Sequence, residues 1–355
     1  MRLLVVTNDF PPKRGGIQMY LKNLLNAFDG ESHVVAPHDP IAENAEQGVT
    51  RGEKTFMLPG RATRSLVLEA CESFQPDAIL FGAPHPLPQL GPWLRTTTGL
   101  PFGILSHGAE VTIPGSLPGA RQLLGRTLAG ADVRFAVSRF TARKVAAISG
   151  RPTEFLGAGV EIETFSPPDI APNREVPVVG CVSRFVPRKG QDRLLRAVAE
   201  LDREVEVLLV GTGREESKLR KLADELDINV RFAVDVEWTE LPGLYRSMDI
   251  FCMPCSSRWA GREVEGLGLV FLEAAASGLP VLAGDSGGSP ETVRPGETGF
   301  VVSSISDIVE GLSMLLDDPV RARGMGEAGR ALVESEFTWA RVVERLNTGF
   351  EPLVR

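Results

Sequence analysis

Short apolar segments alternate with longer stretches of helical periodicity along the whole chain. The apolar segments are rich in β-branched residues, which predicts buried strands. They cover residues 3–8, 33–36, 78–82, 102–106, 133–137, 178–183, 205–210, 230–234, 250–253 and 281–283. Helical patterns lie between or after the first five segments, at residues 17–28, 66–74, 120–129 and 140–148. Strands that alternate with helices in this way are typical of a parallel α/β fold.

A Pro-rich and weakly patterned segment interrupts the alternation at residues 165–177, which read FSPPDIAPNREVP. Polar segments rich in proline form semi-rigid connections between domains. We therefore predict two Rossmann-like domains that face each other across a cleft, over residues 1–168 and 169–335.

The composition changes this picture little but excludes several classes of protein. The 355 residues are 43% hydrophobic and 24% charged, which is typical of a globular chain and not of a disordered or coiled-coil one. With 38 basic and 46 acidic residues the formal net charge is −8, so we expect no nucleic-acid partner.

No apolar run reaches the roughly 18 residues that cross a bilayer. The apolar core of the N-terminus, residues 3–6, is too short for a signal peptide, so we expect a cytoplasmic protein. Four cysteines, Cys71, Cys181, Cys252 and Cys255, suit a reducing compartment. Cys252 and Cys255 have the spacing of a redox motif, but no second pair completes a zinc site, and we expect no metal site.

The first predicted strand leads into a loop that carries paired glycines. The loop reads DFPPKRGG from Asp9 to Gly16, and a helix is predicted from residue 17. Glycines at a strand-to-helix turn let backbone N–H groups approach an anion. The motif fits a phosphate site and a plain tight turn equally well.

The second predicted domain begins with a similar arrangement of strand, turn and helix. Its turn carries Arg184 and Lys189, which could hold a diphosphate between a guanidinium fork and an ammonium point charge. The alternative is a pair of solvated surface cations, and the position of both residues at a strand end favours the site.

Two carboxylates, Glu265 and Glu273, flank a glycine-containing turn that begins a helical segment. Gly266 and Gly268 would expose backbone donors at the start of this helix to phosphate or sugar hydroxyls. Because Glu273 lies between the apolar runs VFL and AAA, we predict that its carboxylate is buried and has a specific partner.

These motifs occur in the order found in retaining GT-B glycosyltransferases of family 4, and the resemblance covers nearly the whole chain. The sequence most resembles the actinobacterial PimB-type phosphatidylinositol mannoside mannosyltransferases. The stretches that carry the resemblance are VTNDFPPKRGGIQ, SRFVPRKGQD and VEGLGLVFLEA, together with SGGSPE at residues 286–291. This chain departs from the family pattern at Ala109, where a histidine is usual, and at Val234, where a glycine is usual.

The resemblance implies a role for each motif. His107, Arg184, Lys189 and Glu265 match catalytic positions, with His107 near the transferred sugar, the two cations on the donor diphosphate and Glu265 on a sugar hydroxyl. Glu273 matches the ribose contact, and Val236 matches a backbone contact to the base. The remaining donor-binding positions are Gly15, Gly16, Gly266, Leu267, Gly268 and Leu269. We expect Asp9 and Gln18 to bind the acceptor, and residues 336–355 to form a helix that crosses back to the first domain.

The implied reaction is the retaining transfer of mannose from GDP-mannose to a phosphatidylinositol-mannoside-like lipid. No cofactor is expected, because the cations and helix amides stabilise the leaving phosphate and no Asp-x-Asp motif for a metal-bound diphosphate occurs. A family 4 transferase that uses UDP-glucose or UDP-GlcNAc and another acceptor is the main alternative.

Two alternatives come from other classes of protein. Gly211-Thr212-Gly213 begins a dinucleotide fingerprint that lacks its third glycine, which leaves a remote NAD-dependent oxidoreductase open. A two-domain sugar-binding protein shares the outline but needs an export signal.

Residues 111–151 form a basic and amphipathic region within this acidic chain. Seven Arg and Lys side chains stand there against the single acid Asp132, and leucines recur at near-helical spacing. The pattern fits peripheral docking on anionic lipid at the inner face of the plasma membrane, and it fits equally a helix with a solvated basic face.

Overall fold

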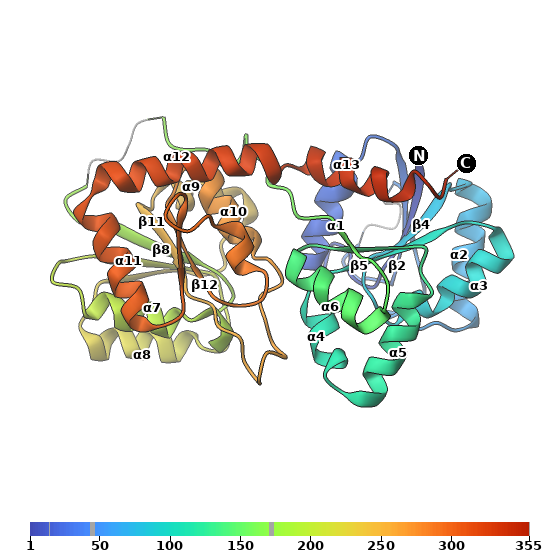
Figure 1. Cartoon of the computed structure of the whole chain (residues 1–355), viewed down its shortest axis with the longest axis horizontal. Helices are drawn as coiled ribbons and strands as arrows, with labels where there is room; N and C mark the ends of the chain where they lie inside the picture. The colour runs from blue at the N-terminus through green and yellow to red at the C-terminus, as the bar shows by residue number, and fades with distance from the viewer. Residues whose placement is uncertain (14, 43–46, 170–173, 355) are drawn as a thin grey trace. The chain divides into compact units, whose positions relative to one another are not determined.

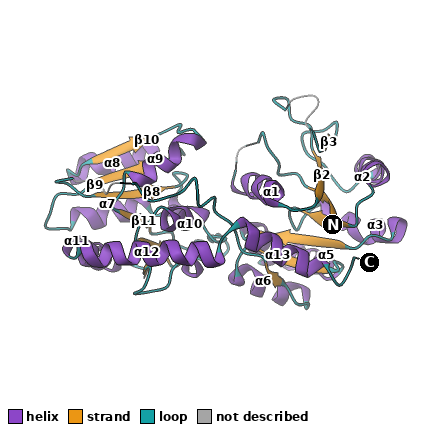
Figure 2. Cartoon of the chain, turned by 90° about the horizontal axis from the view of Figure 1, so that it is seen from above, coloured by secondary structure: helices purple, strands orange, loops and turns teal. Residues whose placement is uncertain are grey.

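The computed structural model describes residues 1–13, 15–42, 47–169 and 174–354. The chain divides into two compact units, Met1–Gly159 with Trp339–Arg355 (unit 1) and Val160–Thr338 (unit 2). Each unit contains one parallel β-sheet with helices on both sides (Figures 1 and 2). The prediction of two Rossmann-like domains is confirmed.

Unit 1 has a seven-stranded sheet of order β3-β2-β1-β4-β5-β6-β7, in which every pairing is parallel. Its strands are β1 (Arg2–Val6), β2 (Glu31–Ala36), β3 (Val49–Arg51), β4 (Ala78–Phe81), β5 (Phe102–Ser106), β6 (Val133–Ala136) and β7 (Glu154–Phe155). Its helices are α1 (Gly16–Ala27), α2 (Arg61–Phe74), α3 (Gly91–Thr98), α4 (Ala109–Gly115), α5 (Pro118–Ala129), α6 (Arg139–Ser149) and α13 (Trp339–Phe350), with the short 3-10 helix η1 (Leu87–Leu90).

Unit 2 has a six-stranded parallel sheet of order β10-β9-β8-β11-β12-β13. Its strands are β8 (Val178–Val182), β9 (Glu206–Val210), β10 (Val230–Ala233), β11 (Ile250–Met253), β12 (Val281–Gly284) and β13 (Gly299–Val302). Its helices are α7 (Gln191–Ala199), α8 (Glu216–Leu226), α9 (Leu241–Arg246), α10 (Leu269–Ala276), α11 (Ile305–Asp317) and α12 (Pro319–Glu336), with the 3-10 helices η2 (Pro187–Lys189), η3 (Trp238–Glu240) and η4 (Ser289–Thr292).

In both sheets the strand order reverses beside the first strand of the unit, between β1 and β4 and between β8 and β11. Ligands of open α/β sheets bind outside the carboxyl ends of the strands at such a reversal. The loop with Gly15 and Gly16 follows β1, and the turn with Arg184 and Lys189 follows β8. The fold therefore brings both motifs to the position where a ligand is expected.

The last helix, α13, belongs to unit 1, although the chain reaches it directly from α12 of unit 2. Trp339 meets Tyr20 of α1 edge to face at 5.3 Å between ring centroids, and the ring centroids of Phe350 and Phe135 of β6 lie 5.5 Å apart. The boundary between the two units lies at Gly159/Val160, nine residues before the predicted boundary at 168/169. The Pro-rich segment that suggested the predicted boundary includes residues 170–173, which lie outside the described part of the chain.

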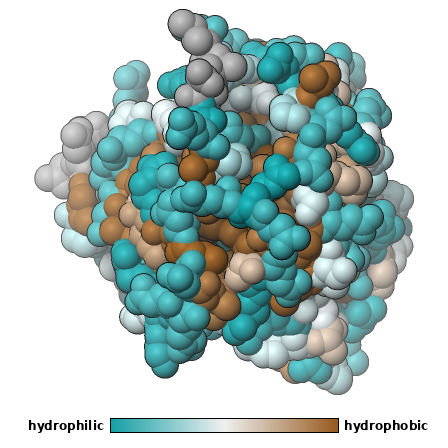
Figure 3. All heavy atoms as spheres, turned by 90° about the vertical axis from the view of Figure 1, so that its left-hand side faces the viewer, coloured by the Kyte–Doolittle hydropathy of each residue, from teal (hydrophilic) through white to brown (hydrophobic). Residues whose placement is uncertain are grey.

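Hydrophilic side chains cover most of the face drawn in Figure 3, with hydrophobic residues visible between them. Within the described residues, no helix is both long and apolar enough to span a bilayer. One basic residue of the 111–151 region is not on the surface, because Arg134 is buried and donates to the carbonyl oxygens of Pro152 and Ala131 at 2.8 and 2.6 Å.

Candidate active site

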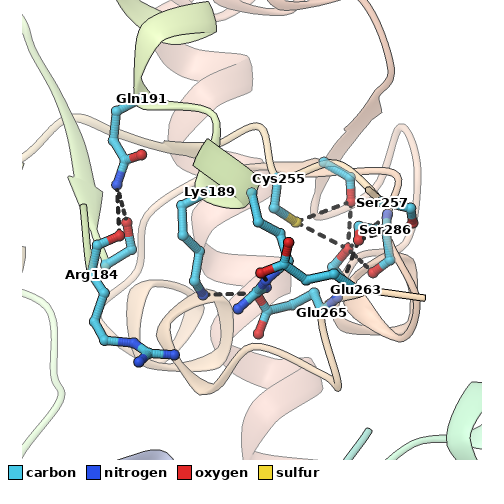
Figure 4. Close-up of polar contacts among 12 residues, drawn as sticks. Arg184, Lys189, Gln191, Cys255, Ser257, Glu263, Glu265 and Ser286 are labelled. Atoms are coloured by element: carbon cyan, nitrogen blue, oxygen red, sulfur yellow. Dashed lines mark hydrogen bonds and ion pairs between the residues drawn. The ribbon is translucent and has the colours of Figure 1, made fainter. Parts of the chain in front are cut away.

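Two cations of the turn after β8 differ in their surroundings. Lys189 is buried at the end of η2, whereas Arg184 is exposed. Among the described residues, no carboxylate lies within ion-pairing distance of the Arg184 guanidinium. Figure 4 shows the two side chains extending in the same direction from the turn. Gly190 ends the turn at a φ of +76°, and a Cβ there would lie 2.2 Å from the carbonyl oxygen of Pro254, so only glycine fits.

Glu265 lies at the centre of a buried ionic cluster (Figure 4). Its Oε2 accepts a hydrogen bond from Lys189 Nζ at 2.7 Å and another from Arg188 Nη1. Glu263 lies on the other side of Arg188, with Oε1 at 3.8 Å from Nε. The other carboxylate oxygen of Glu265, Oε1, accepts no hydrogen bond from a described residue. It is the oxygen that a ligand hydroxyl could reach.

Lys189 and Arg188 together determine the charge state of Glu265. Burial alone would raise the pKa of this carboxyl, but the charges and hydrogen bonds of Lys189 and Arg188 outweigh burial and lower the pKa to about 2. Glu265 is therefore ionised at neutral pH. A fixed negative charge keeps both cations in place.

The turn that reads SGGSPE supports Glu265 from the other side. Ser286 Oγ accepts from the backbone N–H of Glu265 at 3.1 Å, and the N–H of Gly288 donates to the carbonyl oxygen of Glu265 at 2.9 Å. Gly287 has a φ of +61°, and a Cβ there would lie 2.1 Å from the same carbonyl oxygen. The structure thus brings together three of the motifs identified in the sequence.

Glu273 lies on α10, and the prediction that it is buried with a specific partner is confirmed. Its Oε2 accepts a hydrogen bond from the hydroxyl of Tyr245 at 2.7 Å. Burial raises the pKa of this carboxyl to about 7, and the Tyr245 hydrogen bond opposes part of that rise. Phe165 and Phe251 pack against the Tyr245 ring at 5.6 and 5.9 Å between centroids, which holds the hydroxyl on Glu273.

The backbone between the two carboxylates includes the start of α10. Gly266 and Leu267 precede Gly268, which has a φ of +89° and no side chain to cap the helix that begins at Leu269. The first N–H groups of a helix lack partners within the helix and favour an anion. Val236 lies in the segment between β10 and η3 and is half-buried.

In unit 1 the predicted acceptor residues lie together after β1. Gln18 Nε2 donates to Asp9 Oδ1 at 2.8 Å, and Lys13 Nζ approaches the same oxygen at 3.3 Å. Gly15 packs directly on this pair, because a Cβ there would lie 2.3 Å from Gln18 Oε1. Gly16, the first residue of α1, has open space where its side chain would be.

His107 follows β5 and has a fixed tautomer. Its Nε2 lies 3.0 Å from the carbonyl oxygen of Gly82, which can only accept, so the proton is on Nε2. Tyr20 meets the imidazole edge to face at 5.2 Å. Burial lowers the pKa of His107, and the imidazole is neutral at pH 7. The Glu110 carboxylate accepts from the backbone N–H of Gly108 at 2.9 Å, which orders the loop behind the ring.

The sequence interpretation missed Arg188, which is as buried as Lys189 and shares its carboxylate. The only available signal was its position beside Lys189 in PRKG, and adjacency does not show which of two cations faces inward.

Close packing against the backbone explains the two glycines of the Gly211-Thr212-Gly213 motif. A Cβ at Gly211 would lie 2.2 Å from the carbonyl oxygen of Ser183, and one at Gly213 would lie 2.4 Å from that of Phe185.

Cys252 and Cys255 are both buried, unpaired thiols. Cys255 Sγ lies 3.4 Å from Ser289 Oγ, and burial raises its pKa to about 11, so it is a protonated packing residue rather than a reactive thiolate. No group of three or more metal-ligating His, Cys, Asp or Glu side chains occurs in the described ranges.

Comparison with known proteins places these features in a family. Residues 163–332 match the profile of the Glycosyl transferases group 1. Two solved structures share the fold of the whole chain. A sucrose-phosphate synthase from Thermosynechococcus elongatus superposes with a TM-score of 0.82 over 99% of this chain and 98% of its own, at 21% identity. Anabaena HepE in complex with UDP and glucose gives 0.81 over 99% and 100%, at 19% identity. The fold is therefore that of a GT-B glycosyltransferase.

Two relatives are similar in sequence along nearly their whole length. One is a GDP-mannose-dependent monoacylated alpha-(1-6)-phosphatidylinositol monomannoside mannosyltransferase of Corynebacterium glutamicum, 40% identical over 97% of this chain and 96% of its own. The other is the GDP-mannose-dependent alpha-(1-6)-phosphatidylinositol monomannoside mannosyltransferase of Mycobacterium tuberculosis, 39% identical over 97% of both chains. The chain belongs to this family of PimB-type phosphatidylinositol mannoside mannosyltransferases.

Proposed function

We propose that this enzyme transfers mannose, with retention of configuration, from GDP-mannose to a phosphatidylinositol-mannoside lipid. The observation that carries the proposal is the buried cluster of Lys189, Arg188 and Glu265, with Arg184 exposed beside it, at the carboxyl end of the first strand of unit 2. Membership of a family whose relatives are named for this donor and this class of acceptor supports it.

The cations act on the leaving group. As the bond between C1 of mannose and the β-phosphate oxygen breaks, its electron pair moves to that oxygen, and Arg184 and Lys189 stabilise the charge. Preorganised groups of this kind are often the largest single term in catalysis. Lys189 is shared between the phosphate and Glu265, while Arg188 keeps Glu265 in place.

The acceptor hydroxyl attacks C1 from the face that the phosphate leaves. Its proton passes to the departing phosphate oxygen, so the step needs no protein base. His107, neutral and with its proton on Nε2 donated to Gly82, offers Nδ1 to a sugar hydroxyl. Glu265 Oε1 accepts from a hydroxyl of the transferred sugar, and Glu273 accepts from the ribose.

The reaction proceeds without a metal cofactor in this proposal, because Arg184 and Lys189 supply the positive charge that a metal-bound diphosphate site would otherwise need. Transfer measured in EDTA should equal transfer in added Mg²⁺ or Mn²⁺. Loss of activity in EDTA that is restored by a metal would contradict this part of the proposal.

The test of the whole proposal is transfer of radiolabelled mannose from GDP-mannose to phosphatidylinositol monomannoside, with UDP-glucose and UDP-GlcNAc as competing donors. We expect a dimannosylated lipid from GDP-mannose and little product from either UDP-sugar. Preference for a UDP-sugar would leave the proposed fold and mechanism intact but would contradict the assignment of GDP-mannose as the donor.

The acceptor lies in a membrane, and we propose that α4 and α5 dock unit 1 on anionic lipid at the inner face of the plasma membrane. Ile113, Leu117 and Leu123 are about half exposed, and Arg121 and Arg126 are exposed near them. Anionic leaflets attract such basic amphipathic segments by about 1 kcal/mol per cation. Vesicles that contain phosphatidylglycerol should sediment the protein, whereas phosphatidylcholine vesicles and the Leu117→Ser/Leu123→Ser variant should not. Equal sedimentation by both vesicle types would contradict the docking.

A further inference from the structure

Unit 1 has a cavity that the proposed reaction leaves unused. It has a volume of about 690 Å³ and lies between the segment after β3 and the first turns of α2, with lining residues from Arg51 to Glu69. A volume of this size is within the range of sites for small organic ligands.

The cavity is partly apolar, and part of its apolar lining is open to solvent. Met57 and Leu66 are among its lining residues, and Met57 is buried. Phe56 and Leu58 on either side of Met57 are 49% and 62% exposed. Large apolar side chains exposed beside a cavity are typical of a site for an apolar ligand.

Hydrogen bonds join this cavity to the loop that carries the predicted acceptor residues. Asn8 is buried and makes two bonds to Met57, with Nδ2 donating to the carbonyl oxygen at 3.0 Å and Oδ1 accepting from the N–H at 2.7 Å. Arg51 Nη2 donates to the carbonyl oxygen of Pro11 at 2.6 Å. Asp9 stands between these two anchored positions, so the cavity wall and the Asp9–Gln18 pair are held at a fixed distance from each other.

The rim of the cavity carries charge of both signs with a cationic excess. Arg51, Lys54 and Arg61 line it against Glu53 and Glu69, and Lys54 and Arg61 are exposed. This order of groups matches a lipid in which a phosphodiester joins a sugar to acyl chains. The sugar matches the polar loop, the phosphodiester matches the basic rim, and an acyl chain matches the apolar lining.

We propose that this cavity takes one acyl chain of the lipid acceptor, with the phosphodiester at the basic rim and the sugar at Asp9 and Gln18. The assignment rests on the proposed function for the class of acceptor. An apolar chain seated here would fix the lipid along its length.

The test compares two acceptors, diacyl phosphatidylinositol monomannoside in detergent micelles and its water-soluble deacylated counterpart. The variants are Phe56→Ser/Leu58→Ser, which removes the exposed apolar lining, and Leu66→Trp, which fills the cavity. The matched control is Val320→Ser, which removes a 79% exposed apolar side chain from unit 2. Thermal unfolding of each variant checks that the fold is retained.

For the cavity variants we expect the KM of the diacyl acceptor to rise by about tenfold, the effect of losing contact with roughly two methylene groups. In the cavity variants, the KM of the deacylated acceptor should change by less than about twofold. In the Val320→Ser control, the KM of either acceptor should also change by less than about twofold. An equal change for both acceptors, or no change for either, would overturn the proposal. If the wild type used neither acceptor, the proposed function itself would fail, and the acyl-chain site with it.

A second readout does not depend on turnover. An acceptor with a diazirine on one acyl chain should label residues 52–69 on irradiation, and Leu66→Trp should abolish that label. Labelling confined to residues 113–123 would assign the chain to the α4–α5 surface and overturn the cavity site.

Discussion

Glu265 and Glu273 are two buried carboxylates of one unit, eight positions apart in the sequence, and their pKa values shift in opposite directions. Glu265 has Lys189 and Arg188 on one oxygen and a pKa of about 2. Glu273 has a neutral tyrosine hydroxyl and a pKa of about 7. Both side chains are nearly inaccessible to solvent.

Burial acts on both carboxyls in the same direction, so the difference between their pKa values comes from their partners. Burial disfavours the charged form of both, and only a nearby cation reverses that effect. Glu265 is thus ionised near neutral pH and holds Lys189 and Arg188, whereas Glu273 gains or loses its proton near neutral pH. We therefore expect donor binding to depend on pH through Glu273 and not through Glu265.

The largest expected effect comes from removing Lys189, which binds Glu265 and which we assign to the donor diphosphate. Lys189→Ala should lower kcat by about 10²–10³, the usual consequence of deleting one group that stabilises transition-state charge. The circular dichroism spectrum should match that of the wild type. Lys218→Ala, which removes an exposed lysine of the same unit, is the control and should retain full turnover. Near-wild-type kcat in the Lys189 variant would remove Lys189 from the diphosphate site.

Arg188→Ala should chiefly reduce stability, because it takes one of two cations from a buried carboxylate. We expect a loss of about 3 kcal/mol in the free energy of unfolding, measured by urea denaturation at pH 7. Arg188→Lys should recover part of the loss. A change under about 0.5 kcal/mol would show that Lys189 alone keeps Glu265 ionised.

Glu273→Gln should stabilise the protein at high pH. The pKa of Glu273 is about 7 in the folded protein, above its ordinary value of 4.5, so the folded state binds this proton more tightly than the unfolded state. The contribution of the proton to wild-type stability is complete below about pH 4.5 and is lost as pH rises through 7. Because glutamine does not titrate, the free energy of unfolding of the Glu273→Gln variant relative to wild type should rise by about 2 kcal/mol from pH 5 to pH 8. A difference independent of pH would contradict the raised pKa.

The smallest expected effect is a shift in the pH profile of GDP binding. Tyr245→Phe removes the hydrogen bond that favours ionised Glu273, so the pKa of Glu273 should rise further. Calorimetric titration should show that affinity for GDP falls below a midpoint near pH 7 in the wild type and below a higher midpoint in the variant. At pH 7 the variant should bind GDP about threefold more weakly. Unchanged midpoints would separate Glu273 from donor binding.

Much of the fold could be predicted from the sequence because its strands are continuous apolar runs. Among the described strands, the pattern missed three that lie at the edge of a sheet, β3 with its sequence VTR, β7 with EF and β13 with GFVV. They form because the neighbouring strand offers backbone partners, as β2 does for β3, and no periodicity within two to four residues encodes that.

Features of the candidate site were predictable where neighbouring residues in the sequence determine the environment of a side chain. An acidic residue inside an apolar helix indicates a buried carboxylate with a partner, and Glu273 has one. The identity of the partner was not predictable, since Tyr245 is 28 positions away and comes from α9. For the same reason the pairing of Arg188 with Glu265, across 77 positions, is visible only in the fold.

The measurement that tests the central claim most directly is calorimetric titration of the wild type and Lys189→Ala with GDP, UDP and NAD in EDTA. We expect the wild type to bind GDP more tightly than UDP and not to bind NAD. The Lys189 variant should bind GDP at least about tenfold more weakly, since it loses a charge-assisted contact to phosphate. Equal GDP affinity in the two proteins, or binding of NAD alone, would contradict the assignment of this cluster to the donor diphosphate.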